Sequence, residues 1–297
     1  MDVSIIIVNY NSYQLILKAI ESIYAFTEGL TFEIIVVDNN SPQRDIEQLQ
    51  DHYKEVHYIS NVQNKGFGSG NNVGAKYAKG KYLLLLNPDT LLLNNAIGRF
   101  FSFCEKKPQV GIVGGNLYDL NRKPAFSCWS FLPGLLAEID FLCHHQLGKL
   151  LGRVGSFNYT DHPQKVGYIS GADLFIARNT YLQAGGFDED FFMYYEETEL
   201  TYRVKQLGYE VYILPDASII HLEGQSESDY EKIGFRMRQS EKLYYRKTKQ
   251  QYLIRLSYIV DIAYYQLHIF YNKIKGDRNK MKLFKDKLCL IRKVEKI

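Results

Sequence analysis

The sequence predicts an α/β protein built on a mainly parallel sheet with helices on both faces. Short apolar runs, rich in Ile, Val or Leu, recur in the first third of the chain, at 3–8, 32–37 and 82–86. Continuous apolar runs of this length are typical of strands buried in a parallel sheet. Segments with apolar residues at helical spacing separate them, and this alternation predicts helices on both faces.

Each element can be assigned in order along the chain. The expected elements are a strand at 3–10, a helix at 13–26, a strand at 32–41, a short helix at 46–53, a strand at 56–60, a glycine-rich loop running into a helix at 64–80, and a strand at 81–90. Asn11 and Ser12 are expected to cap the first helix. Pro88 is expected to end the last strand, because proline cannot donate to a sheet hydrogen bond.

The charge pattern divides the chain into an acidic body and a basic tail. Residues 1–229 carry 18 Lys and Arg against 27 Asp and Glu, a net charge of −9. Residues 230–297 carry 18 Lys and Arg against 6 Asp and Glu, a net charge of +12. We therefore expect the two parts to have different roles. The hydrophobic content of 46% excludes a wholly disordered chain.

The cysteines and the amino terminus indicate in which cellular compartment the protein is expected. The four cysteines lie far apart and form no Cys-x-x-Cys motif, which favours reduced thiols in a cytosol over a disulfide framework. No basic segment precedes the first strand, so no signal peptide is expected. His144 and His145, beside Cys143, are interpreted as non-ligands, because no second cluster completes a metal site.

Polar side chains follow the buried strands at their carboxyl ends. Asp38 closes the second strand and Asp89 the fourth, while Asn9 and Asn11 close the first. Carboxyl ends of parallel strands share one sheet edge, where ligands bind in open α/β sheets. Taken singly, Asp38 fits a turn and Asp89 a helix cap. Together, with the glycine-rich loop at 64–80 between them, these residues favour a nucleotide site.

The glycine-rich loop does not match the best-known phosphate-binding motifs. Its GFGSG stretch lacks the G-x-G-x-x-G spacing after the first strand, and it lacks the G-K-[ST] ending of a P-loop. Both the NAD-binding and the P-loop interpretations are therefore disfavoured.

Several stretches, in the right order and spacing, resemble glycosyltransferase family 2, whose members have the GT-A fold. They read SIIIVNYNS, IIVVDNNS, NKGFGSGNNVG and LLLLNPDT, and residues 168–226 match in the second half of the chain. Within the family the nearest resemblance is to bacterial rhamnosyltransferase-like enzymes. The resemblance covers roughly residues 3–226 and is interrupted over 119–165.

The resemblance implies a domain organisation. A GT-A catalytic domain is expected at 1–229, with a nucleotide-sugar half at about 1–118 and an acceptor half at about 119–229. A basic helical tail is expected at 230–297.

The resemblance also implies a metal site for the donor. A sugar nucleotide leaves as a diphosphate, and a divalent cation stabilises the negative charge that develops on it. In the family a D-x-D motif holds this cation, Mg²⁺ or Mn²⁺, and here the motif reads Asn87-Pro88-Asp89. Asp89 is then the metal ligand, and Asn87 faces the donor ribose or phosphate. His221 corresponds to a family histidine that reaches the metal or diphosphate, although a lone histidine is more often structural.

Base recognition is assigned in the same way. Asp38 corresponds to the family's base-recognition aspartate, because a carboxylate accepts the N3–H of uracil or thymine. The expected donor is therefore a UDP- or dTDP-sugar. Lys65, Gly66 and Asn72 match the family's loop segment, where small residues let the backbone approach the nucleotide. Lys65 equally fits a solvated surface lysine, and Arg178 is a weaker candidate for a phosphate contact.

A second acidic cluster opens a helix in the second half of the chain. Glu196, Glu197 and Glu199 lie within four residues of sequence, where the helix dipole by itself favours acidic residues. The stretch matches the family's acidic motif, whose second acid is the catalytic base. Glu197 holds that position, with glutamate in place of aspartate, and Glu196 is the alternative. The matching SGAD turn makes Gly171 and Asp173 acceptor-contact candidates.

An inverting transfer needs one protein carboxylate. That group deprotonates the acceptor hydroxyl while the hydroxyl attacks the anomeric carbon, and the metal assists departure of the diphosphate. Glycosidases differ because they need a pair of carboxyl groups.

The tail is predicted to contain an amphipathic helix. Arg255 and Asp261 interrupt the apolar residues of 251–272, so no run of roughly eighteen apolar residues exists and a transmembrane helix is not expected. The expected apolar face consists of Leu253, Leu256, Val260, Ala263, Leu267 and Phe270. With the lysines that follow, residues 251–297 fit an anionic membrane surface. The alternative is packing on the catalytic domain or on a partner subunit.

The function predicted from the sequence is that of an inverting glycosyltransferase. It would move a sugar from a UDP- or dTDP-sugar to a glycan or lipid-linked acceptor in bacterial surface polysaccharide synthesis, in the cytoplasm at the inner face of the plasma membrane. The alternative is a nucleotide-sugar-binding protein without transferase activity, because the first acid of the D-x-D motif is absent. Nucleic-acid binding is not expected, since the body is acidic and carries no reader motif.

Overall fold

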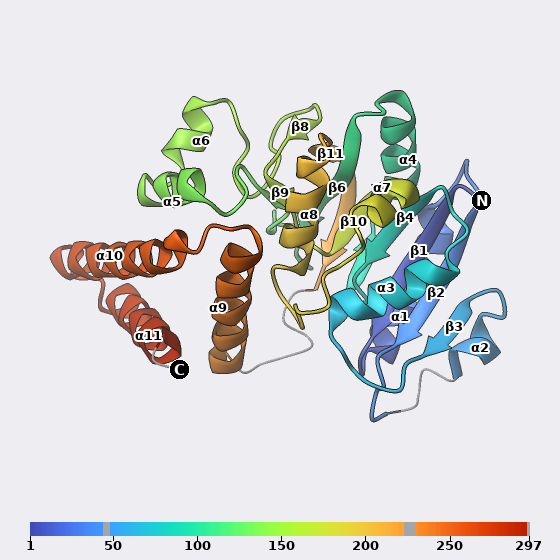
Figure 1. Ribbon diagram of the computed structural model, residues 1–297, viewed down its shortest axis with the longest axis horizontal. Helices are drawn as coiled ribbons and strands as arrows, with labels where there is room; N and C mark the ends of the chain where they lie inside the picture. Colours follow the sequence, from blue (N-terminus) through green and yellow to red (C-terminus); the bar gives the residue numbers. More distant parts are fainter. Residues whose placement is uncertain (44–47, 223–229, 296–297) are drawn as a thin grey trace.

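The computed structural model describes residues 1–43, 48–222 and 230–295; residues 44–47, 223–229 and 296–297 lie outside that part. A large mixed sheet forms its centre (Figure 1). Its strands are β1 (Val3–Asn9), β2 (Phe32–Asp38), β3 (His57–Ser60), β4 (Tyr82–Leu86), β5 (Thr90–Leu92), β6 (Val110–Tyr118), β8 (Gln164–Lys165), β10 (Asp173–Ala177) and β11 (Glu210–His221). A separate pair consists of β7 (Cys128–Trp129) and β9 (Tyr168–Ile169).

The amino-terminal strands form the expected parallel sheet. The order begins β3-β2-β1-β4, and every neighbouring pair in it is parallel. In this register Asn9 lies directly opposite Asp38, because both are the last residues of their strands. The chain then passes Pro88 and begins the separate strand β5, so proline ends β4 as predicted.

The second half of the chain completes this sheet and does not form a sheet of its own. Strand β10 pairs antiparallel with both β4 and β6, and the order continues β10-β6-β11-β5. Strand β5 pairs antiparallel with β11, which places Thr90 opposite His221. The two expected halves, about 1–118 and 119–229, therefore interdigitate within one sheet.

Helices cover both faces, as the alternation of elements predicted. The helices are α1 (Tyr13–Phe26), α2 (Leu49–His52), α3 (Phe67–Tyr77), α4 (Ala96–Lys106), α5 (Leu135–Leu142), α6 (Gln146–Leu150), α7 (Arg178–Gln183), α8 (Glu196–Gln206), α9 (Tyr230–Lys247), α10 (Tyr252–Lys275) and α11 (Arg278–Glu295). One apolar cluster packs α1 and α4 on the sheet, and a second packs α3, α7 and α8 on the opposite face. The short helix expected at 46–53 is α2, and residues 46 and 47 lie outside the described part.

Two of the predicted helix caps are wrong. Ser12 is the amino-terminal cap of α1, but its hydroxyl donates to the carbonyl of Tyr10 and makes no capping bond. Asp89 does not cap α4, because Asn95 does so by accepting from the amide of Gly98 at 3.0 Å. The side chain of Asp89 is thereby left for another role.

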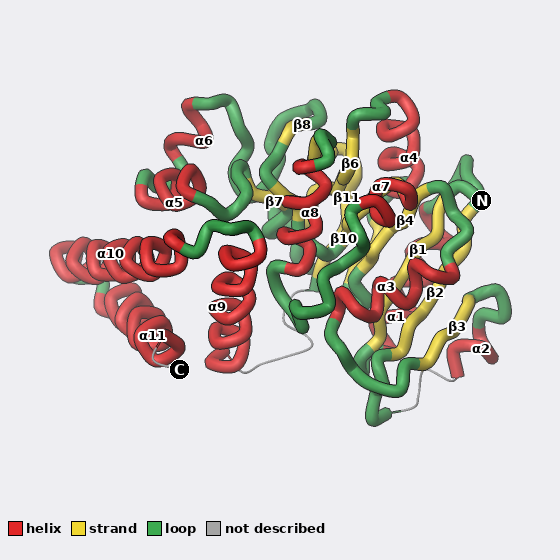
Figure 2. The backbone as a smooth tube through the Cα atoms, in the orientation of Figure 1, coloured by secondary structure: helices red, strands yellow, loops and turns green. Residues whose placement is uncertain are grey.

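The segment at 119–165 and the tail pack together at one end of the molecule. Figures 1 and 2 show α5 and α6 on the side of the sheet where α9, α10 and α11 lie, and α5 contacts α10. The buried residues Phe191, Tyr244, Tyr245 and Leu253 form a separate small core there. The expected domain border at 229 and 230 falls beside the residues outside the described part.

The amphipathic helix of the tail is α10, and only part of its predicted apolar face is exposed to solvent. Leu253 and Val260 are buried against the rest of the protein, as the packing alternative predicted. Farther along the helix, Leu267 and Phe270 are 64% and 63% exposed. Asn272 is buried, and its side-chain amide donates to the carbonyl of His268 at 2.8 Å. No helix in the described ranges is long and apolar enough to cross a membrane.

Candidate active site

Two strand ends bring together the side chains expected at the metal. Asp89 follows β4, and His221 is the last residue of β11. Asp89 Oδ1 lies 3.4 Å from His221 Nε2, and the side-chain nitrogen Nδ2 of Asn87 lies 3.3 Å from the same His221 atom. The side chains of Asp89 and His221 are 12% and 11% exposed, so both are largely but not fully buried.

This pair suits a divalent cation that also binds phosphate oxygens. Mg²⁺ and Mn²⁺ usually take one or two protein ligands in phosphate sites, with substrate oxygens and water as the others. The imidazole nitrogen favours Mn²⁺, because Mg²⁺ prefers oxygen ligands. No group of three or more His, Cys, Asp or Glu that could hold a metal by itself occurs in the described part of the chain.

Asp38 forms the turn that its sequence context also predicted. Its Oδ1 accepts from the Asn9 amide at 2.6 Å and from the Ser41 hydroxyl at 2.5 Å. Its Oδ2 accepts from the Ser41 backbone amide at 3.1 Å. Asn11, which has a left-handed backbone with φ of 54°, donates its own amide to Ser41 Oγ at 3.0 Å. These bonds fix the edge of the sheet, and recognition of a base by Asp38 stays a prediction.

The glycine-rich loop is held against the second half of the chain. Gly66 has φ of 96°, and a Cβ built on it would lie 2.0 Å from the carbonyl oxygen of Phe192. Glycine is therefore required by the approach of the 192 backbone, a different reason from the nucleotide contact expected for it. Asn39 donates to the Gly66 carbonyl at 2.9 Å and joins this loop to β2. Lys65, the residue before Gly66, is exposed.

Asn72 has a positioning role that its motif did not suggest. Its amide donates to the Phe187 carbonyl at 2.9 Å, and its Oδ1 accepts from the Tyr181 hydroxyl and the Phe187 amide. It also donates to Glu189 Oε1 at 3.3 Å. The side chain thus ties α3 to the segment that precedes α8, and nucleotide contact by Asn72 stays a prediction.

The two candidate bases differ in accessibility. Glu196 is buried, and its Oε2 has no hydrogen-bond partner in the described part of the chain. Glu197 is partly exposed and accepts from the Thr198 hydroxyl at 2.9 Å. Burial raises the pKa of both carboxyl groups, and the neighbouring Glu197 charge raises the pKa of Glu196 further. Glu199 is instead neutralised by Arg203, whose Nε donates to it at 2.8 Å.

Backbone strain precedes these carboxyl groups. Tyr194 and Tyr195 have φ of 69° and 66°, in the left-handed region that bulky residues rarely adopt. Two consecutive residues of this kind are costly, and such strain concentrates at functional sites. The strained pair directs the chain into α8 so that Glu196 and Glu197 occupy its first turn.

The turn at 170–173 connects the metal-site residues to Glu197. The backbone amide of Asn87 donates to the Ala172 carbonyl at 2.9 Å. A Cβ built on Gly171 would lie 3.5 Å from Glu197 Cβ and Cγ, so this half-buried glycine borders the candidate base. One turn therefore contacts both parts of the site, and acceptor contact by Gly171 stays a prediction.

Two sequence-predicted residues lie elsewhere than expected. Asp173 is fully buried, and its Oδ2 accepts from the Gly115 amide at 2.6 Å, so its side chain does not reach the surface where an acceptor would bind. Burial raises the pKa of Asp173 to about 7. Arg178 begins α7 at the far end of β4, where its amide donates to Lys81, away from the phosphate position.

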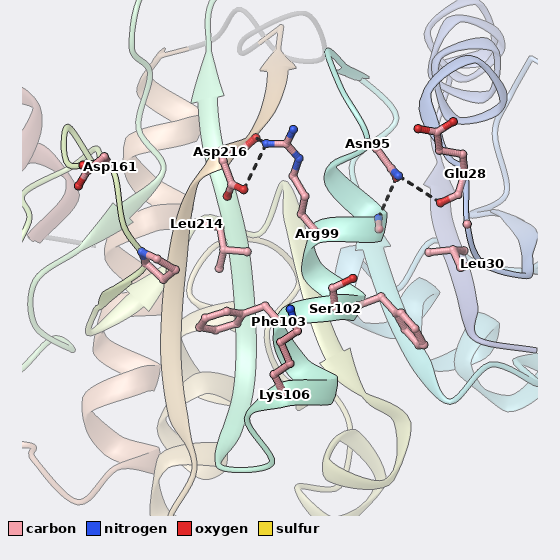
Figure 3. Close-up of a pocket in the computed structure, with 14 residues that line it drawn as sticks. Glu28, Leu30, Asn95, Arg99, Ser102, Phe103, Lys106, Asp161, Leu214 and Asp216 are labelled. Atoms are coloured by element: carbon pink, nitrogen blue, oxygen red, sulfur yellow. Dashed lines mark hydrogen bonds and ion pairs between the residues drawn. The ribbon is translucent and has the colours of Figure 1, made fainter.

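A broad surface pocket of about 870 Å³ lies away from these residues (Figure 3). It lies on the sheet face that carries α1 and α4 and includes the Arg99–Asp216 ion pair. None of its lining residues is among the predicted site residues. His144 and His145 also lie apart from the strand ends; the His145 ring packs in a tilted orientation against Trp129, with ring centroids 4.8 Å apart.

Sequence reasoning missed several residues that shape the site. Ser41 and Asn39 follow Asp38 directly, and turn chemistry could have indicated their roles. Phe192 and Ala172 act through backbone carbonyls, and no side-chain pattern in a sequence reports such contacts.

The fold is the GT-A fold of solved glycosyltransferases. A mannosyltransferase from Pyrobaculum calidifontis, solved with GDP-Man and Mn²⁺, aligns with a TM-score of 0.61 at 14% identity, over 98% of this chain and 84% of its own. The GalNAc-T7 structure with UDP, GalNAc and Mn²⁺ aligns with a TM-score of 0.59 at 17% identity, over 82% of this chain and 50% of its own.

Sequence similarity indicates a family for the amino-terminal part of the chain. Residues 4–126 match glycosyl transferase family 2. A low-salt glycan biosynthesis hexosyltransferase of Haloferax volcanii is 27% identical over 77% of this chain and 70% of its own. The rhamnosyltransferase WbbL of Escherichia coli is 26% identical over 79% of this chain and 88% of its own. The chain is therefore similar to family 2 glycosyltransferases, bacterial rhamnosyltransferases among them.

Proposed function

We propose that the protein transfers a sugar, with inversion, from a UDP- or dTDP-sugar to a glycan or lipid-linked acceptor in surface polysaccharide synthesis. The observation that carries this proposal is the approach of Asp89 and His221 from two separate strands, with Glu197 joined to them through the turn at 170–173. Relatives named for rhamnosyl transfer and glycan biosynthesis support it.

Asp38 is the candidate for base recognition. Its Oδ2 accepts a single hydrogen bond, from Ser41, and a carboxylate oxygen can accept a second. Uracil and thymine both present an N3–H to such an acceptor. The bonds from Asn9 and Ser41 hold the carboxylate still, so little side-chain entropy is lost when a base binds.

Asp89 and His221 would hold the divalent cation, with Asn87 beside them. When bound, the cation supplies charge stabilisation for the departing diphosphate. The two side chains are 12% and 11% exposed, so neither is sealed in the core.

Glu197 would accept the proton of the acceptor hydroxyl. Burial holds its pKa above the usual value, which brings the carboxylate closer in basicity to the working pH of a general base. The hydrogen bond from Thr198 keeps one oxygen oriented and leaves the other for the acceptor. Glu196 is buried and less suited to reach a substrate.

The tail would hold the enzyme at an anionic membrane surface on the cytoplasmic side. Leu267, Phe270 and Ile274 of α10 are exposed, and Leu136 of the neighbouring α5 is exposed as well. Lysines follow them along the tail, whose net charge from 230 onward is +12. An apolar face beside basic residues binds such surfaces by burial and by attraction to anionic lipid.

Calorimetry with UDP- and dTDP-sugars, with and without Mn²⁺, tests the proposed donor site. Wild-type protein should bind at least one of them, and Mn²⁺ should increase the affinity. Asp89→Ala should lose the metal-dependent part of the affinity while keeping the fold, as judged by circular dichroism. Asp216→Ala, on the distant Arg99 ion pair, is the control and should bind like wild type. Metal-dependent binding by Asp89→Ala would remove Asp89 from the metal site.

A further inference from the structure

The segment that leads into α8, residues 187–195, forms neither a helix nor a strand. This 187–195 segment brings the chain to the first turn of α8, so its path decides where Glu197 lies. It ends with Tyr194 and Tyr195, whose left-handed backbones are strained. Strain of this kind persists only where the surroundings over-determine the conformation. The contacts that hold the segment therefore matter for the position of the candidate base.

One set of contacts comes from the glycine-rich loop and α3. The Phe192 carbonyl accepts from the Phe67 amide at 3.1 Å, directly after the close approach of that carbonyl to Gly66. The Asn72 side chain, farther along α3, donates to the Phe187 carbonyl at 2.9 Å. These bonds attach one side of the 187–195 segment to the donor end of the sheet.

A second set of contacts comes from α9, the first helix of the tail. Lys247 Nζ lies 2.7 Å from Asp188 Oδ2, and it also pairs with Asp190. The hydroxyl of Ser240, a buried residue, donates to the Met193 carbonyl at 2.8 Å. The second of these contacts lies directly before the strained tyrosines. Polar side chains of α9 therefore hold the segment at two separate points.

Aromatic side chains extend the contact between α9 and the segment. Phe191 is fully buried and belongs to the small core that includes Tyr244 of α9. The ring centroid of Tyr195 lies 5.8 Å from that of Tyr244. The Arg236 guanidinium lies 5.5 Å from the centre of the Phe192 ring. Helix α9 therefore covers most of the length of the 187–195 segment.

Two lysines of α9 form ion pairs with different parts of the protein. Hydrogen bonds to Asp188 and Asp190 raise the pKa of Lys247 above its ordinary value. Lys242, on the same helix, pairs instead with Glu295 of α11 at 3.1 Å. Lys247 thus binds the 187–195 segment, whereas Lys242 binds another helix of the tail. The chain itself offers a matched comparison between holding the segment and stabilising the tail.

We propose that Lys247 and Ser240 of α9 are positioning residues for transfer, because they hold the 187–195 segment in the path that presents Glu197 to the acceptor hydroxyl. The inference rests on the proposed transferase function and adds a role for the tail within it. This role differs from that of α10, since α9 acts on the position of the base and not on membrane binding.

Hydrogen exchange measured by mass spectrometry tests the contact without any substrate. Lys247→Met removes the charge at nearly constant length, so amides in peptides covering 187–195 should exchange roughly threefold to tenfold faster, the value of two partly exposed ion pairs. Lys247→Arg keeps the charge and should restore slow exchange. Lys242→Met is the matched control, and exchange in the 187–195 segment should equal that of wild type. Circular dichroism checks that each variant is folded.

Transfer rates test whether the contact serves catalysis. Initial rates are measured at saturating radiolabelled donor, with a membrane extract as acceptor source. Lys247→Met and Ser240→Ala should each lower the rate roughly threefold to tenfold, by loosening the segment before the base. Lys247→Arg should recover most of the rate, and Lys242→Met should transfer like wild type. The affinity for UDP, measured by calorimetry, should stay within about twofold in all variants, because the turn at Asp38 keeps its own hydrogen bonds.

A double-mutant cycle separates positioning from a general loss of stability. In a protein that carries Asp188→Asn and Asp190→Asn, Lys247→Met should lower the rate no further, because its partners are already neutral. An additive loss in this background overturns the proposal. So does an equal loss in Lys242→Met, or a wild-type rate in both Lys247→Met and Ser240→Ala. A wild-type protein that transfers no sugar from any donor would instead contradict the proposed function, whatever the exchange of the segment.

Discussion

The donor end of the sheet and the cavity beside the tail are built on opposite principles. At the donor end, Asn9, Asp38 and Ser41 satisfy one another with short hydrogen bonds. The cavity of about 190 Å³ beside the tail is lined by Tyr195 and Asp261, whose side chains are partly exposed. The donor end is held together by local hydrogen bonds, whereas the cavity is lined by side chains that solvent can reach.

The two regions also differ in how the chain builds them. The donor end uses strand ends and the turns next to them, so its residues are positioned by sheet register. The cavity uses a helix from the 119–165 segment and helices from the tail, which meet only after folding. A substitution in the second region can therefore leave the first undisturbed.

The largest expected effect is a loss of transfer rate in Glu197→Gln without a loss of nucleotide affinity. Glu197→Gln should bind nucleotide like wild type but lose transfer by roughly a hundredfold or more, the usual range for removing a general base. Initial rates with radiolabelled donor and a membrane extract as acceptor source measure transfer, and calorimetry measures donor binding. Glu196→Gln is the matched control, because it makes the same change one residue earlier at a buried position.

The pH profile gives the same prediction a second readout. A general base must be ionised, so the rate should rise with pH through the raised pKa of Glu197, above the ordinary glutamate value of 4.5. This acid limb should disappear in Glu197→Gln and remain in Glu196→Gln. Near-normal turnover of Glu197→Gln with an inactive Glu196→Gln would assign the base to Glu196.

A smaller effect tests whether Asp38 does more than form its turn. Asp38→Ala should weaken uridine or thymidine nucleotides about tenfold or more, the value of a hydrogen bond to a charged group. Asp38→Asn should lose less, since its carbonyl oxygen still accepts from N3–H. Ser41→Ala disturbs the same turn and leaves the carboxylate in place. If Ser41→Ala weakens nucleotide binding as much as Asp38→Ala, Asp38 is only a turn residue.

The smallest expected effect concerns the membrane. Point substitutions are preferable to truncation, because removing α10 and α11 would expose Tyr244 and Tyr245 and leave Arg238 without Ser257 and Glu295. Phe270→Ser should lower sedimentation with vesicles containing anionic phosphatidylglycerol several-fold, by removing an exposed aromatic side chain. Binding should also fall as salt rises.

The control for vesicle binding is an exposed apolar residue on another face. Val62→Ser, in the loop before the glycine-rich segment, should sediment like wild type. Equal sedimentation of Phe270→Ser and wild type, or no binding of wild type at low salt, would contradict a membrane role for α10.

Local patterns in the sequence determined the fold class and much of the donor site. Apolar runs specify buried strands, and a residue at the end of such a strand must lie at the sheet edge, so Asn9, Asp38 and Asp89 could be placed without coordinates. Proline at 88 ended β4 because it lacks an amide hydrogen. The family resemblance added His221, whose position opposite Thr90 brings it to Asp89.

Tertiary structure alone decided the rest. Burial of Asp173 depends on β10 entering the sheet between β4 and β6, which no local pattern reports. Gly66 is required by a backbone carbonyl from residue 192, a contact invisible in side-chain sequence. The cavity arises where Trp129, Tyr195 and Asp261 meet. Helical periodicity indicates that α10 has an apolar face, but the packing of α5 and α9 determines which part of it is buried, because burial depends on neighbours distant in sequence.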